Sequence, residues 1–162
     1  MDQQRPQSRD FDSFFVDEFP AIVRAAWFVV LDTDLAHDVA QEAFCRALQR
    51  WHRISRYDRP GAWVRMVAIR IALRSRDRRR REVELTDATV GSIDDHGLTS
   101  GDLESALRSL PRQQRAAAVL RYLYDLDITD VADALRCKPS TARVHLHRAR
   151  KALGDLLGVQ AR

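Results

Sequence analysis

Apolar residues recur about every 3.6 positions along most of this chain, and that spacing constrains its fold more than any other feature. One apolar stripe lies between Phe11 and Val30, and a second lies between Leu35 and Trp51. Each is typical of the buried face of an amphipathic helix. Because no stretch alternates apolar and polar residues as a half-buried strand would, the sequence predicts an all-α protein.

Residues with known preferences at helix ends mark where the helices begin. Thr33 and Asp34 can cap the second helix, and Leu48 is predicted to belong to its inward stripe. A loop over residues 52–59 precedes Pro60, which suits the first position of a third helix because an N–H there would have no partner. The third helix is apolar at its start and mostly arginine at its end.

The helical pattern breaks after the third helix and then resumes. Residues 82–101 lose the period and are rich in Gly, Ser, Thr and Asp, which predicts a flexible acidic linker. Beyond it, Asp102 is the expected cap of one helix and Pro111 opens the next, on which Leu123 is predicted to point inward. The predicted architecture is two small helical domains joined by a linker: residues 10–81, 82–101 and 102–158.

The distribution of charge tells more than the net charge of +4. Residues 51–81 hold 11 basic and 2 acidic side chains, a net charge of +9, and residues 136–162 hold 7 and 1, a net charge of +6. The 29 residues from 82 to 110 hold 1 basic and 7 acidic side chains, a net charge of −6. Two basic blocks that are separated by an acidic stretch predict two separate contacts with a polyanion.

The last part of the chain has the pattern of a helix-turn-helix. A short helix is predicted over residues 129–135, then a tight turn over residues 136–138, then a longer helix that Pro139 begins and that reaches Leu157. The inward positions are assigned to Val131, Ala132, Leu135, Val144, Leu146, Ala149 and Leu153. On the longer helix the exposed residues are of types that can enter the major groove of DNA: Thr141, Arg143, His147, Arg148 and Lys151.

These motifs resemble a known family. The stretch SLPRQQRAAAVLRYLYDLDITDVADALRCKPSTARVHLHRARKAL looks like the promoter −35-binding domain of the extracytoplasmic-function sigma factors, group 4 of the sigma-70 family. Two further segments, AHDVAQEAFCRALQRW and PGAWVRMVAIRIALRSRDRRRR, are similar to the polymerase-binding helix and the −10-recognising helix of that family. The resemblance extends from about Asp10 to Leu157. It implies a factor that binds core RNA polymerase, recognises and melts promoters, and starts transcription.

The resemblance also implies roles for individual residues. Three polar residues would face the polymerase: Asp38, Gln41 and Glu42. Contacts to −10 DNA are expected from Arg56, Tyr57, Arg59, Arg65, Arg70, Arg74 and Arg78, and contacts to −35 DNA from the exposed residues of the recognition helix given above. From the period of the apolar residues alone, the three polar residues would simply form the solvent-exposed face of an amphipathic helix. Tyr57 could stack an unpaired base or simply close a turn.

Two positions depart from the family pattern. The family usually has glycine where Arg136 stands, so the turn of the helix-turn-helix is expected to be built slightly differently. The family often has asparagine where Arg70 stands, and the expected contact there becomes one of arginine with a phosphate or a base edge.

Other classes of function fit the sequence less well. A helix-turn-helix regulator that does not act as a sigma factor, and a nucleic-acid-processing enzyme, are the two alternatives. No nucleophile, phosphate-binding loop or metal-binding motif lies beside the acidic residues. His145 and His147 lie two positions apart on a helix, so they point to different faces and cannot bind one metal ion together. Neither catalysis, nor a cofactor, nor a metal is therefore expected. The sequence has no apolar run of the ~20 residues that cross a bilayer and no signal peptide, which predicts a cytoplasmic protein. An anti-sigma factor is a further possible partner, because relatives commonly have one.

Overall fold

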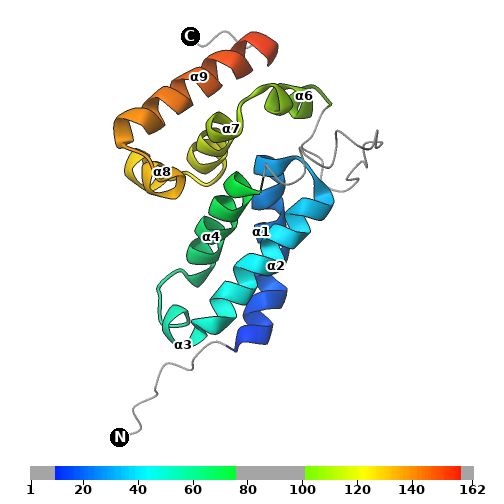
Figure 1. Cartoon of the computed structure of the whole chain (residues 1–162), viewed down its shortest axis with the longest axis vertical. Coiled ribbons are helices and arrows are strands. Elements are labelled where there is room, and N and C mark those ends of the chain that lie inside the picture. The colour runs from blue at the N-terminus through cyan, green and yellow to red at the C-terminus, as the bar shows by residue number, and fades with distance from the viewer. Residues whose placement is uncertain (1–9, 76–100, 158–162) are drawn as a thin grey trace, which may run out of the picture.

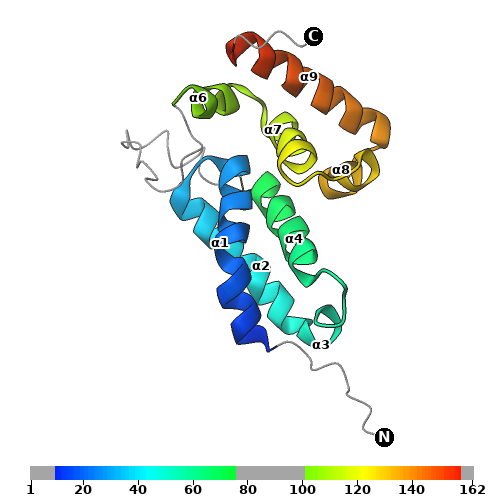
Figure 2. The same ribbon diagram turned by 180° about the vertical axis from the view of Figure 1, so that it is seen from behind.

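The structure, a computed structural model, describes residues 10–75 and 101–157. Every regular element in these two ranges is a helix, which confirms the all-α prediction. Figure 1 shows two groups of helices that follow one another along the long axis of the molecule, and Figure 2 shows the same arrangement from behind. None of the helices in the described residues is long and apolar enough to cross a membrane.

The N-terminal group contains three long helices and one short helix: α1 (Phe11–Val30), α2 (Thr33–Gln49), α3 (Trp51–Ile54) and α4 (Pro60–Arg74). The cap of α2 is Asp32, whose carboxylate accepts a hydrogen bond from the Leu35 N–H at 2.8 Å. The expectation that Thr33 and Asp34 cap this helix is therefore wrong by one residue. The single turn of α3 extends into the predicted loop 52–59, and the arginine-rich continuation to residue 81 lies outside the described residues.

The C-terminal group comprises α6 (Gly101–Ser109), α7 (Arg112–Ala118), the π-helical turn η1 (Val119–Leu123), α8 (Ile128–Leu135) and α9 (Pro139–Leu157). Helix α6 begins at Gly101, so Asp102 lies inside it and is not its cap. Pro111 is the residue before α7 and not its first residue. The extra residue in η1 was not predicted, because a π turn has no composition that distinguishes it from an α-helix.

The core of the N-terminal group is built from rings at one end and small residues along its length. The ring centroids of Phe14 and Trp51 lie 4.7 Å apart, and those of Phe15 and Phe44 lie 4.9 Å apart. Elsewhere, alanines with no exposed surface let α1, α2 and α4 approach closely: Ala25, Ala26, Ala36, Ala40, Ala43, Ala47, Ala68 and Ala72. The apolar core continues from this group into α7, η1 and α8.

Three large apolar residues that the periodicity placed inside are exposed: Leu48 by 56%, Leu123 by 49% and Val144 by 46%. In α2 the inward position is taken by Ala47, and the close approach that alanine permits leaves its neighbour Leu48 outside. In η1 the additional residue of the π turn changes the angle between successive side chains and rotates Leu123 outward. In α9 the inward positions are those of Ala142 and Ala149, which have no exposed surface.

Candidate nucleic-acid interface

The helix-turn-helix is held by local hydrogen bonds at both ends of α8. At its start, the Asp127 carboxylate accepts from the Asp130 N–H at 2.8 Å. At its end, the Cys137 N–H donates to the Ala132 carbonyl at 3.0 Å. Arg136, the residue that follows the end of α8, adopts the left-handed conformation, with φ 53° and ψ 46°. The turn therefore keeps the geometry that glycine favours, and the expectation that arginine builds it differently is wrong.

The outer face of α9 brings together the residues predicted to read the −35 element. All of them are exposed: Thr141, Arg143, His147, Arg148 and Lys151. Val144 lies on the same strip, since it is three residues after Thr141 and four before Arg148. The same spacing could have identified Val144 as part of this surface, but its apolar character favoured a core position.

The residues predicted to contact −10 DNA fall into an exposed set and a half-buried set. Arg56, Tyr57 and Arg59 lie between α3 and α4 and are exposed, with Tyr57 showing 38% of its surface. Arg74 is exposed at the C-terminal end of α4. Arg65 and Arg70, on α4, are only partly exposed, and Arg78 lies outside the described residues.

Arg70 reaches from α4 to the helix-turn-helix. Its Nη2 donates to the Asp133 carbonyl at 2.8 Å, and its Nε lies 3.4 Å from the Ala134 carbonyl. Both carbonyls belong to the last turn of α8, where backbone oxygens lack partners within the helix. Burial lowers the pKa of the Arg70 guanidinium, and the positive charge of Arg136 lowers it further. The sequence did not predict this contact, because every residue has a backbone carbonyl and nothing in the sequence marks which carbonyl an arginine will bind.

Arg65 is engaged with the C-terminal group as well. Its guanidinium carbon lies 4.1 Å from the centroid of the Tyr124 ring, a cation–π contact. Its Nε is buried and has no hydrogen-bond partner. Burial raises the pKa of the Tyr124 phenol, although the charge of Arg65 opposes that rise. Both half-buried arginines of α4 therefore contact η1, α8 or the residues between them.

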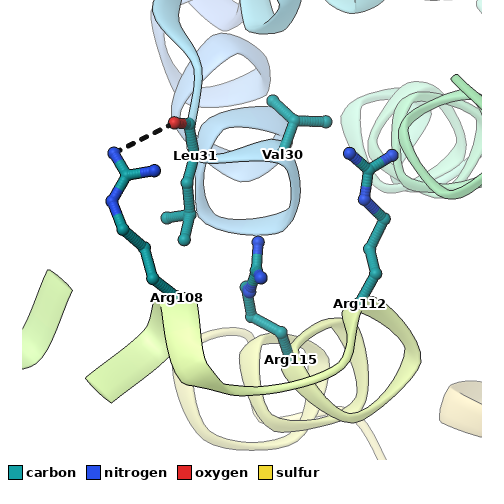
Figure 3. Close-up of a pocket in the computed structure, with 5 residues that line it drawn as sticks. All are labelled: Val30, Leu31, Arg108, Arg112 and Arg115. Atoms are coloured by element: carbon teal, nitrogen blue, oxygen red, sulfur yellow. Dashed lines mark hydrogen bonds between the residues drawn. The ribbon is translucent and has the colours of Figure 1, made fainter. Parts of the chain in front are cut away.

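Three arginines of the C-terminal group point back toward the N-terminal group. Figure 3 shows Arg108, Arg112 and Arg115 around a pocket at the end of α1. Nη2 of Arg108 lies 3.3 Å from the Leu31 carbonyl, and Nη1 of Arg112 donates to the Ala72 carbonyl at 2.6 Å.

Arg115 is buried and makes the most extensive of these contacts. Its Nη1 donates to the Val29 carbonyl at 2.7 Å, while its Nε and Nη2 donate to the carbonyls of Leu107 and Leu110 at 2.8 and 3.0 Å. The side chain thus ties α6 to the start of α7 and both to the end of α1. A buried guanidinium is tolerated here because several of its N–H groups have carbonyl acceptors.

The three residues predicted to face the polymerase lie on one exposed side of α2. Asp38, Gln41 and Glu42 are all exposed, and Glu42 forms an ion pair with Arg46 one turn later. Leu48 continues this side toward the end of the helix and adds an exposed apolar group to it. Acidic and amide groups beside an apolar group suit a protein partner with basic residues.

Candidate ligands for a metal do not converge in the described part of the chain, where no group of three His, Cys, Asp or Glu side chains could hold an ion. The cysteines lie apart, with Cys45 exposed on α2 and Cys137 partly buried in the turn after α8. Burial raises the pKa of the Cys137 thiol, while the backbone N–H of Ala142 favours its thiolate.

Two family models match the chain in sequence order. The model for sigma-70 region 2 matches residues 14–82, and the model for sigma-70 region 4 matches residues 100–153. The RNA polymerase sigma-H factor of Pseudomonas aeruginosa is 28% identical over 95% of this chain and 89% of its own length. The sigma factor SigV of Bacillus subtilis is 25% identical over 80% of each chain.

A solved structure is similar over both groups of helices. It is the sigma factor RpoE of Bartonella quintana in complex with the anti-sigma factor NepR. The two chains superpose with a TM-score of 0.74 and 26% identity, and the match covers 94% of this chain and 99% of that one.

Proposed function

This chain belongs to the sigma-70 family, in its extracytoplasmic-function branch, and from that membership we propose how its surfaces divide the work of a sigma factor. A sigma factor is a transcription initiation factor that gives RNA polymerase its promoter recognition. The observation that carries the proposal is the match to regions 2 and 4 in order, with an exposed basic face on each. The proposed units are residues 10–81 and 102–158, joined by residues 82–101.

The C-terminal unit is proposed to read the −35 element. The exposed strip of α9 offers two arginines, a histidine and a threonine for base edges and Lys151 for a phosphate. On the opposite side of α9, Ala142 and Ala149 have no exposed surface, and Ala149 belongs to the buried cluster of Leu107, Leu110 and Ala118.

The N-terminal unit is proposed to bind the polymerase and the −10 element. Asp38, Gln41 and Glu42 on α2 would dock on basic residues of the polymerase. The exposed Tyr57, beside Arg56 and Arg59, would stack a base of the separated strand. Strand opening would then draw on contacts that only single-stranded DNA can make, and the chain itself would perform no catalysis and need no cofactor.

The cellular setting follows from the partner. A factor that loads onto RNA polymerase acts where the polymerase is, so a cytoplasmic location is proposed. An anti-sigma factor is proposed as a further partner, because the similar structure of RpoE is a complex with one.

Run-off transcription with purified core RNA polymerase tests the function directly. Genomic fragments are incubated with core enzyme alone and with core enzyme plus the chain. We expect discrete transcripts that need both components. Binding of the chain to specific DNA without any transcript, and without binding to core enzyme, would favour the alternative of a helix-turn-helix regulator.

A further inference from the structure

The recognition helix α9 carries an exposed apolar residue among the side chains proposed to read DNA. Val144 shows 46% of its surface to solvent. Helix α9 packs on α6, α7 and α8, and Figure 1 shows it on the side of the C-terminal group that faces away from α1, α2 and α4. The outer face of α9, and Val144 with it, is therefore open to a partner.

The direction of Val144 is set by the residues two positions before and after it. Successive residues of an α-helix are rotated by about 100°, so two positions correspond to more than half a turn. Ala142 has no exposed surface, and Leu146 packs against the core. The Ala142 N–H donates to the Lys138 carbonyl at 3.0 Å, which ties down the start of the helix. Because both flanking residues are directed inward, Val144 points outward.

Exposed polar residues surround Val144 on this face. Those about one turn away are Ser140 and Thr141 on its N-terminal side and His147 and Arg148 on its C-terminal side. Each of the four can donate a hydrogen bond to a base edge or a phosphate, whereas the valine side chain can make apolar contacts only. A single exposed apolar residue is common on protein surfaces. Val144 differs from the common case in its place at the centre of four such donors.

The major groove of DNA offers one apolar group to such a residue. Every base pair presents donors and acceptors there, and thymine alone adds a methyl group, at C5. A valine against the polar edge of another base would remove water from that edge without replacing its hydrogen bonds, at a cost in free energy. Against the thymine methyl, the contact removes apolar surface from water, which is favourable.

We propose that Val144 contacts the C5-methyl group of a thymine in the −35 element and thereby selects this base. The inference rests on the proposed function, because it requires α9 to read the −35 element. The side chain is suited to the contact, since a β-branched residue has one strongly preferred χ1 rotamer in a helix. Its two methyl groups are held in place before DNA binds, so little conformational entropy is lost on binding.

The spacing along α9 predicts where this thymine lies. Val144 and Arg148 are four residues apart, which corresponds to about 6 Å along the helix axis. Successive base pairs of DNA are about 3.4 Å apart. The thymine is therefore expected within two base pairs of the position at which Arg148→Ala relaxes the preference.

The test removes methyl groups from the DNA and from the protein separately. Each thymine of the −35 element, on either strand of a promoter found by run-off transcription, is replaced in turn by deoxyuridine, which lacks only the C5-methyl group. The affinity of holoenzyme for each duplex is measured with the wild-type chain, with Val144→Ala and with the matched control Val16→Ala. Val16 is 69% exposed on α1, outside the recognition helix. Circular dichroism checks that each variant keeps its helices.

One deoxyuridine substitution is expected to weaken binding by the wild-type and control holoenzymes by about fourfold, the effect of one methyl group that is no longer buried. The same substitution leaves the affinity of the Val144→Ala holoenzyme unchanged, because the methyl groups that it would contact are already absent. Independent effects of the two changes at every thymine, or a −35 element that contains no thymine, overturn the proposal.

A different result overturns the proposed function. If wild-type holoenzyme binds a promoter with a scrambled −35 element as tightly as the native promoter, α9 does not read this element at all. If the native element is preferred but no effect of deoxyuridine depends on Val144, the reading of the element by α9 stands and the role of Val144 in it is overturned.

Discussion

Arg136, in the turn between α8 and α9, occupies a backbone conformation that suits glycine. A side chain in the left-handed region meets its own backbone, at a cost of about 1 kcal/mol. Glycine avoids that contact, so the turn carries a small strain that its hydrogen bonds to α8 outweigh. The sequence indicated strain here, but it could not show whether the turn would change its geometry or Arg136 would adopt the left-handed conformation.

The variant Arg136→Gly is expected to raise the free energy of unfolding by about 1 kcal/mol, because it relieves this strain. Arg136→Ala is the control, since alanine removes the charge and keeps the Cβ. The measurement is urea unfolding followed by circular dichroism. Equal stabilisation by both variants would mean that the effect comes from the charge next to Arg70 and not from the backbone.

Arg148 is the residue most central to the proposed reading of the −35 element. Arg148→Ala is expected to relax preference at one or two −35 positions, since a bidentate contact to a base contributes about 1–3 kcal/mol of discrimination. Arg150→Ala is the matched control on the same helix, where a phosphate contact is expected. Holoenzyme binding is measured on a promoter and its single-base variants. Uniform weakening by Arg148→Ala, with altered preference in the control, would reverse the two roles.

At the scale of helices, several starts were predicted to within a residue or two, but the single turn of α3 and the π turn η1 were not predicted. Caps and prolines constrain the backbone locally, which is why α9 begins at Pro139 and ends at Leu157 as predicted. The inward or outward direction of single residues was less predictable. Leu48, Leu123 and Val144 were assigned to the core because they are apolar, but alanines and a π turn decide which side is buried.

Helix α2 presents the surface proposed for polymerase. Asp38→Arg is expected to weaken binding to core enzyme by about tenfold or more, because it places a like charge opposite basic partner residues. The control is Asp17→Arg, a matching charge reversal at an exposed position on α1. Titration of labelled chain with core polymerase gives both affinities. An unchanged affinity for Asp38→Arg would remove this side of α2 from the proposed interface.

At the scale of the whole molecule, the sequence predicted the two helical groups but not the contact between them. The basic blocks and the helix-turn-helix pattern are local features, and they indicated the surfaces that are proposed as the candidate site. The arginines that connect the two groups donate to backbone oxygens up to 86 positions away, as between Arg115 and Val29. A backbone carbonyl leaves no pattern in the sequence that marks it as a hydrogen-bond acceptor. The sequence therefore favoured DNA as the partner of Arg65 and Arg70 and did not predict their contacts with α8 and with the residues after η1.

The arginines at 78–81 lie outside the described residues and are predicted from the sequence to meet phosphates. Replacing all four with glutamine should weaken holoenzyme binding to every promoter variant alike. The slope of log affinity against log salt should become shallower by roughly one unit for each phosphate that the variant no longer neutralises. Salt titrations from low to physiological ionic strength measure this slope. A changed preference among promoter variants, with an unchanged slope, would place these arginines on bases instead.

The hydrogen bonds from Arg108, Arg112 and Arg115 to backbone carbonyls of the N-terminal group also limit how evolution can change this contact. Every residue supplies a carbonyl whatever its side chain, so no missense mutation at Val29, Leu31 or Ala72 removes the acceptor itself. Selection can therefore change these hydrogen bonds mainly through the arginines that donate them. Sequence change at these three buried positions is limited by their packing in the core and not by the hydrogen bonds that their carbonyls accept.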